Sequence, residues 1–157
     1  MERSEGGIDL GASVGYRLKE ASSALHAAME DVLRPLGLNI TQYSTLELLA
    51  QRPGLSSSDL ARGTFVTRQS MSIVLQGLAA TGLVSRADAA TVGRVLPVEL
   101  TDVGAERLRV ASAAVRKVEQ RMLAGVGSDE TALLRRLLDR CTTALRAPDA
   151  ADGRPVG

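Results

Sequence analysis

Five polar side chains stand at the start of one predicted helix, in the segment VTRQSMSIVLQGLAATGLVSR (66–86). Arginine can pair with a guanine edge or a phosphate, and glutamine can form two hydrogen bonds with adenine N6 and N7. Threonine can cap a helix, and serine is short enough to let the backbone approach another molecule. These types predict contacts with DNA; the alternative is a capped helix with a solvated face. The five residues are Thr67, Arg68, Gln69, Ser70 and Ser72.

The helix that carries these residues is expected to run from a Thr67 cap to about Thr81, with Gly82 at its C-terminal end. A shorter helix precedes it, because Ser56 and Asp59 suit the first turn of a helix. The inward stripe of the longer helix is Met71, Val74, Leu75 and Leu78. Two helices joined by a short turn are typical of a helix-turn-helix, whose second helix enters the major groove.

Two short strands follow this pair of helices. LVSR and VLPVEL read as strands on either side of a polar loop at 87–94, and Pro97 places the second strand at an exposed edge. Such a hairpin would form a wing beside the helix-turn-helix.

Amphipathic helices flank this unit on both sides. Apolar residues recur with a helical period from Val14 to Leu33, and we expect Thr41 to cap the next helix. After the strands, helices are expected from Thr101 and Ser128, and Cys141 falls on the apolar stripe of the last one, where we expect a buried thiol. The outer stripes have no partner within a DNA-binding unit, so we expect a second subunit to cover them.

The order of elements predicts a mainly α fold with a small β-hairpin wing. A winged helix-turn-helix domain at about 41–100 would be flanked by N- and C-terminal dimerisation helices at about 10–36 and 102–146. We expect a single domain over 1–146. The remaining residues, 147–157, consist mainly of Pro, Asp, Gly and Ala and are expected to form a disordered tail.

The composition narrows the classes of protein that fit. The 157 residues are 45% hydrophobic and only 2% aromatic, which favours a helical core of Leu, Val, Ala and Met. One cysteine and one histidine exclude an internal disulfide and a structural zinc site. No catalytic arrangement, glycine-rich phosphate loop or long apolar segment is visible, so we expect no enzyme, no cofactor, no membrane span and a cytoplasmic location.

Four segments in order resemble the MarR family of bacterial transcription regulators, and the resemblance covers about residues 12–146. It implies a homodimer, a pseudo-palindromic operator of double-stranded DNA, and repression relieved by a small molecule. The chain is therefore expected to be a sequence-specific DNA-binding regulator; the alternative is a winged-helix module that binds protein. The segments are PLGLNITQYSTLELLA (35–50), SSSDLAR (56–62), VTRQSMSIVLQGLAATGLVSR (66–86) and GRVLPVELTDVGAERL (93–108).

The resemblance adds residues outside the recognition helix to the predicted DNA surface. Arg94 at the wing tip is expected in a minor groove, where a narrow A·T-rich stretch concentrates negative potential; the alternative is a solvated loop arginine. Arg86 is expected to contact a phosphate or a structural partner such as Asp88. The full predicted set is Ser56, Thr67, Arg68, Gln69, Ser70, Ser72, Arg86 and Arg94.

The chain departs from the family pattern at three positions. Many members have arginine where this chain has Ile73, so one groove contact is absent or replaced by apolar contact with a thymine methyl. Val92 stands where an acidic residue is common two places before the wing arginine. Phe65 occupies the turn position at which glycine is frequent in helix-turn-helix proteins, and we interpret it as filling the core.

The resemblance also implies a ligand site between the dimerisation helices and the winged domain. A small aromatic or phenolic molecule is the ligand class that it suggests. Two of the candidate residues have simpler interpretations, Tyr43 as a core residue and His26 as a solvated one. The candidates are Tyr16, Arg17, His26, Met29 and Tyr43.

Overall fold

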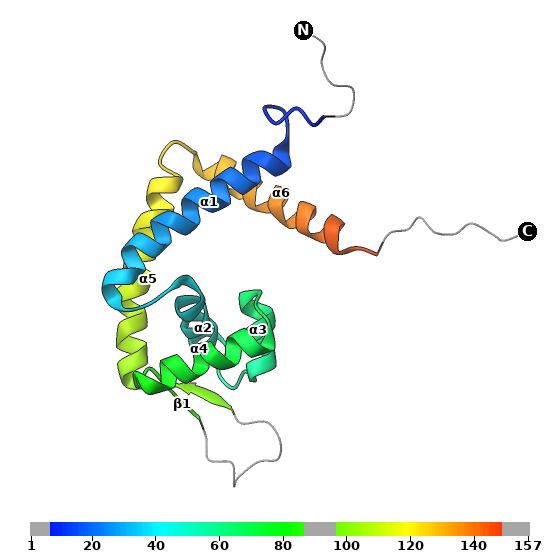
Figure 1. The fold of residues 1–157 in the computed structure, drawn as a ribbon. Helices are drawn as coiled ribbons and strands as arrows, with labels where there is room; N and C mark the ends of the chain where they lie inside the picture. Colours follow the sequence, from blue (N-terminus) through cyan, green and yellow to red (C-terminus); the bar gives the residue numbers. More distant parts are fainter. Residues whose placement is uncertain (1–6, 87–96, 149–157) are drawn as a thin grey trace, which may run out of the picture. The chain divides into compact units, whose positions relative to one another are not determined.

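The computed structural model describes residues 7–86 and 97–148 (Figure 1). The chain divides into two compact units, Met1–Val118 and Glu119–Gly157. None of the described helices is long and apolar enough to cross a membrane. In chain order the elements are α1 (Val14–Leu33), η1 (Arg34–Leu36), α2 (Ile40–Gln51), α3 (Ser57–Thr64), α4 (Arg68–Ala80), β1 (Val84–Arg86), β2 (Val98–Leu100), α5 (Asp102–Met122) and α6 (Ser128–Arg146).

Side-chain caps fix where the helices of the first unit begin. Asn39 caps α2: its Oδ1 accepts from the Gln42 backbone N–H at 2.8 Å, and Gln42 Oε1 accepts from the Asn39 N–H at 2.9 Å. The prediction that Thr41 caps this helix is wrong, because the reciprocal pair starts the helix two residues earlier and leaves Thr41 inside the first turn. Thr67 caps α4 as predicted, and Ser56, which was expected at the start of the shorter helix, caps α3.

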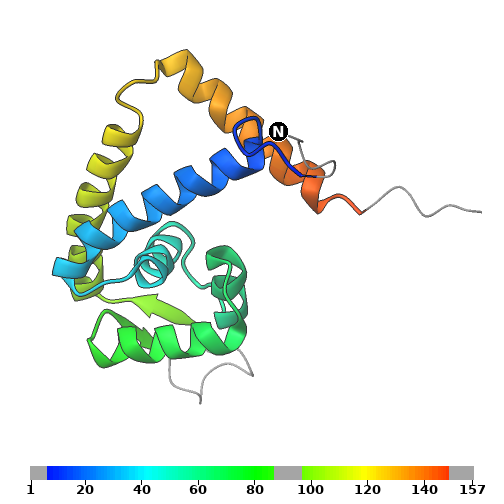
Figure 2. The ribbon, with the colours of Figure 1, turned by 45° about the horizontal axis from the view of Figure 1, so that its top comes forward.

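Fully buried aliphatic side chains from α1 to β2 form the core of the first unit. These side chains come from α1, α2, α3, α4 and the hairpin, and Figure 2 shows the ribbons of α2, α3, α4 and the hairpin close together. The predicted inward stripe of α4 is confirmed, since Met71, Leu75 and Leu78 are completely buried. The other large buried side chains include Leu33, Leu46, Leu60, Leu83 and Val98.

Phe65 does not fill the core, and this prediction is wrong. Its side chain is 82% exposed, while Val66, one residue later, packs against the core. The backbone of Phe65 is left-handed (φ 60°, ψ 36°), and this conformation ends α3 and directs the chain toward α4. The turn therefore points the smaller Val66 side chain toward the core and the larger Phe65 side chain toward solvent.

β1 and β2 pair antiparallel, with Val84 opposite Leu100 and Arg86 opposite Val98. β1 begins one residue later than predicted, and Pro97 stands just before β2, where it has no ladder bond to donate. Thr101 joins the hairpin to α5, because its hydroxyl donates to the Gly82 carbonyl at 2.6 Å and accepts from the Gly104 N–H at 3.0 Å.

The second unit contains the end of α5, a turn and α6. Glu130 Oε2 accepts from the Gly127 N–H at 2.8 Å and so stabilises the start of α6. No residue of α6 is buried, and the prediction of a buried Cys141 is therefore wrong for the single chain, in which this thiol is exposed. The reason is that nothing in its own unit covers the apolar stripe. The predicted tail lies outside the described residues from position 149 on.

Candidate nucleic-acid interface

The N-terminus of α4 is held by its own hydroxyl groups. Thr67 Oγ1 accepts from the Ser70 backbone N–H at 3.1 Å and donates to Ser70 Oγ at 2.9 Å. Both residues remain exposed, so the pair fixes the helix start and still presents hydroxyl oxygens to a partner. Arg68 and Gln69 follow directly and are exposed, and neither side chain forms a hydrogen bond or ion pair with another described residue.

Helical geometry gives α4 a well-defined outward face. With 3.6 residues per turn, Leu75 and Leu78 lie within about 40° of Met71 around the helix axis. By the same geometry Gln69, Ile73 and Gln76 lie about 140° to 160° from Met71. These three side chains, the outward face of α4, are all exposed, and Ile73 is 66% exposed. The core contacts on one side thus point the opposite side to solvent.

Sequence reasoning included Gln69 but did not assign a contact to Gln76. The signal was available: Gln76 is seven residues beyond Gln69, which is the spacing of neighbours two turns apart on one helix face. Ser72, which was included, lies between the two faces and is half-buried.

Ser56 is engaged within its own helix. Its hydroxyl donates to Asp59 Oδ2 at 2.6 Å and accepts from the Asp59 backbone N–H at 3.1 Å. Hydrogen bonds from the Ser56 side chain and backbone hold the pKa of Asp59 below its usual value, and Arg62 adds an ion pair to the same carboxylate. With this donor already in use, Ser56 can offer a phosphate only the half-buried start of the helix.

The wing is described only in part. Arg86, at the end of β1, is exposed in the same unit as α4. Arg94, together with Val92 and Asp88, lies outside the described residues.

Tyr43 lies on α2, and the other four predicted ligand residues lie along α1. Tyr16 and Arg17 lie in its first turn, where Arg17 pairs with Glu20 at 2.8 Å. Met29 packs against the core to which Tyr43 belongs, and His26 is exposed. A rise of about 1.5 Å per residue separates Tyr16 from Met29 by about 20 Å. One small molecule therefore cannot touch all five residues of a single chain.

Tyr43 takes part in a polar cluster that sequence reasoning missed. Its hydroxyl donates to Glu47 Oε1 at 2.8 Å, and the Ser112 hydroxyl on α5 donates to the same oxygen. Burial raises the pKa of Tyr43. Burial also opposes ionisation of Glu47, but hydrogen bonds from Ser112, Tyr43 and Gln51 outweigh it and lower the pKa of Glu47. The cluster links α2 to α5 through one carboxylate.

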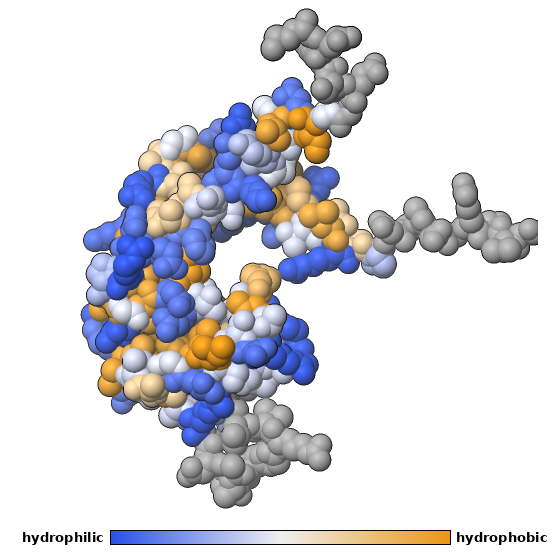
Figure 3. Space-filling view, viewed as in Figure 1, coloured by the Kyte–Doolittle hydropathy of each residue, from blue (hydrophilic) through white to orange (hydrophobic). Residues whose placement is uncertain are grey.

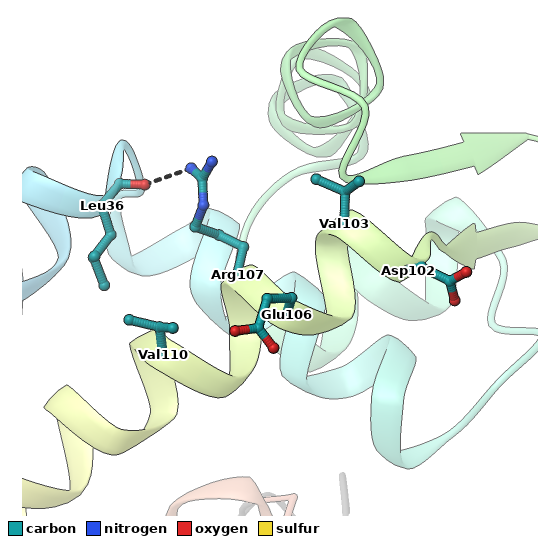
Figure 4. A pocket seen from close by; sticks show the side chains of 6 residues that line it. All are labelled: Leu36, Asp102, Val103, Glu106, Arg107 and Val110. Carbon is teal, nitrogen blue, oxygen red and sulfur yellow. Dashed lines mark hydrogen bonds between the residues drawn. The ribbon is translucent and has the colours of Figure 1, made fainter.

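A cavity of about 540 Å³ lies between η1 and the first half of α5 (Figure 4). Leu36, Val103 and Val110 supply its apolar wall, and Arg107 spans it by donating to the Leu36 carbonyl at 2.7 Å. Asp102 and Glu106 complete the lining, and the five predicted ligand residues are not among those that form it.

Comparison with known proteins gives one consistent result. A family model described as the MarR family matches residues 36–95. The HTH-type transcriptional repressor Rv2887 of Mycobacterium tuberculosis is 36% identical over 129 residues, which span 82% of this chain and 93% of that protein.

Two crystal structures of Rv2887 show the same similarity in three dimensions. Its complex with DNA matches with a TM-score of 0.69 and 33% identity, covering 83% of this chain and 98% of the other. Its complex with salicylic acid matches with a TM-score of 0.68 and 36% identity, covering 83% and 96%.

Proposed function

The chain belongs to the MarR family, and from this premise we propose that it is a homodimeric, sequence-specific DNA-binding repressor that a small aromatic ligand releases from its operator. The observation that carries the proposal is the start of α4. Arg68 and Gln69 are exposed beside a rigid cap, and the helix behind them is anchored by three fully buried side chains. A recognition helix needs this combination of a fixed axis and free polar side chains.

The polar groups divide into two kinds of proposed contact. Thr67, Ser70 and the start of α3 at Ser56 suit phosphates, because hydroxyls and helix N-termini favour anions. Gln69 suits an adenine edge, and Arg68 suits a guanine edge or a phosphate. Ser72 and Arg86 are proposed contacts at the margin of this surface, and Arg94, which lies outside the described residues, is also a proposed contact. Such a protein acts on the chromosome, so we propose a cytoplasmic location.

Dimerisation is proposed through the long outer helices α1, α5 and α6. On α6, four leucines at helical spacing are 38% to 46% exposed in the single chain: Leu133, Leu134, Leu137 and Leu138. Apolar atoms over α6 are visible at the surface in Figure 3. A stripe of this kind is stabilised when a second copy covers it, and a two-fold dimer presents two recognition helices to a pseudo-palindromic site.

The proposed ligand is a small aromatic carboxylate or phenol, since the relative Rv2887 has been crystallised with salicylic acid. Met29 and Tyr43 are proposed for one end of the site because the fold places both at the same core. Tyr16, Arg17 and His26 would reach the same molecule only if another copy of the chain brought them to it. A ligand bound beside these helices would favour a spacing of the recognition helices that no longer matches successive major grooves, about 34 Å apart.

Selection of bound duplexes from a random DNA pool tests the proposal directly. We expect one pseudo-palindromic sequence to be enriched, and salicylic acid or a related compound to weaken binding to it. A pool that shows no enrichment over several rounds, at low and at moderate salt, would contradict DNA recognition and favour the protein-binding alternative.

A further inference from the structure

Ile73 is the apolar member of the outward face of α4. It stands between Gln69 and Gln76, is 66% exposed, and projects away from the buried stripe of the same helix. Surface over α4 is coloured as hydrophobic in Figure 3. A side chain in the middle of a recognition face contacts base edges if that face enters the major groove.

The chemistry of the major groove limits what Ile73 can recognise. Its side chain has no hydrogen-bonding group, whereas the base edges offer donors, acceptors and one apolar substituent, the C5-methyl group of thymine. Resting on the proposed DNA-binding function, we infer that Ile73 reads a thymine methyl in each operator half-site. Its role is thus to determine specificity, alongside the hydrogen bonds of Gln69.

Helix geometry gives the position of that thymine. Ile73 is four residues beyond Gln69, which is about 6 Å along the helix axis. Successive base pairs are about 3.4 Å apart, so the methyl lies within about two base pairs of the adenine that Gln69 contacts. The operator half-site therefore contains an adenine and a nearby thymine in fixed register.

Replacing thymine by deoxyuridine tests the inference, because the change removes only the methyl group. The operator selected by the full chain is resynthesised with uracil at one thymine position of the half-site at a time, and Kd is measured by fluorescence anisotropy. We expect one position at which the loss is about fourfold for one half-site and about fifteenfold for both, as for burial of a methyl-sized group.

Protein variants assign the effect to its side chain. Ile73→Ala should bind the thymine operator as weakly as the parent binds the uracil operator, and should lose nothing further with uracil. Ile73→Val should keep most of the uracil penalty. As a control, Val103→Ala shortens an exposed valine on α5 and should keep the whole uracil penalty. Because Ile73 is exposed, thermal unfolding should confirm that these variants fold as the parent does.

Three outcomes would overturn the inference and can be distinguished. If the parent binds its operator specifically but tolerates uracil at every thymine, methyl reading is wrong and the proposed function stands. If the uracil penalty persists in Ile73→Ala, another residue reads the methyl. If no operator can be selected, both the inference and the proposed function fail.

Discussion

Phe65 combines a left-handed backbone with an aromatic side chain that is 82% exposed. A non-glycine residue in this conformation costs about 1 to 2 kcal/mol, and the exposed ring recovers little of it by burial. Phe65→Gly should therefore raise the free energy of unfolding by about 1 kcal/mol in urea titrations.

Phe65→Ala separates the two features, because it removes the ring and keeps the backbone strain. It should leave stability close to that of the parent. Equal stabilisation by alanine and glycine would mean that the exposed ring, and not the backbone, is the unfavourable feature.

Glu47 should make the stability of the protein depend on pH. Its pKa is lowered in the folded protein, so the contribution of the carboxylate is present above the unfolded value of about 4.3 and is lost as pH falls through the folded value. Unfolding in urea between about pH 5 and pH 3 should show a steeper loss of stability in the parent than in Glu47→Gln.

Ser112→Ala keeps the charge of Glu47 and removes one donor, so its pH dependence should be intermediate. Identical slopes in the parent and in Glu47→Gln would show that the α2–α5 cluster contributes nothing to the pH dependence.

Gln69 and Arg68 are expected to differ in how they recognise DNA. Gln69→Ala should weaken operator binding by about 1 to 3 kcal/mol and relax the preference at one base pair per half-site. For Arg68→Ala, a loss that is equal across sequences and lowers the salt dependence would indicate a phosphate contact, and a loss confined to guanine-containing sites would indicate base reading. Two variants that bind as the parent does, with the same salt dependence, would mean that the helix start is merely solvated.

At the scale of elements, two glycines within helices should respond oppositely to the same substitution. A Cβ on Gly104 of α5 would lie 2.0 Å from the Leu83 carbonyl oxygen and 2.9 Å from Leu100 Cδ1, so Gly104→Ala must displace the hairpin from the helix. We expect it to lower the free energy of unfolding by about 2 to 4 kcal/mol.

Gly77→Ala is the matched control on α4. The nearest atom to its Cβ would be Gln42 Nε2 at 3.8 Å, an ordinary contact, and alanine favours helix over glycine by about 1 kcal/mol. In thermal unfolding, the Tm of Gly77→Ala should be higher than that of the parent, and the Tm of Gly104→Ala should be lower. A Gly104→Ala protein as stable as the parent would contradict the close packing of α5 on the hairpin.

At the scale of the whole molecule, DNA binding should require the proposed dimer. Leu137 is 42% exposed on the leucine stripe of α6, and a charge there would be buried without a partner if a second copy covers the stripe. Leu137→Arg should therefore halve the mass measured by light scattering and abolish operator binding. Leu25→Arg tests the α1 stripe in the same way.

Ile73→Arg introduces the same charge on α4 and should leave the mass unchanged. A dimer that persists in both leucine variants would place the subunit interface elsewhere.

Many features of this protein could be predicted from its sequence because they depend on local chemistry. The caps at Ser56 and Thr67, the buried stripe of α4 and the order of the elements depend on residues within a turn or two of one another. Such short-range hydrogen bonds and periodicities act wherever the segment lies. The polar start of α4 could be identified for the same reason, and the resemblance to the MarR family followed from ordered local segments.

Tertiary structure decided which side chains are covered and which meet. Glu47 and Ser112 are 65 residues apart in the chain, and no local pattern links them. Phe65 and Cys141 have apolar or soft side chains that favour burial, yet a left-handed turn exposes one and a helix uncovered in its own unit exposes the other. The outward position of Ile73 likewise depends on which face of α4 the core occupies. Burial is a property of the elements that surround a residue, and the residue type sets only its preference.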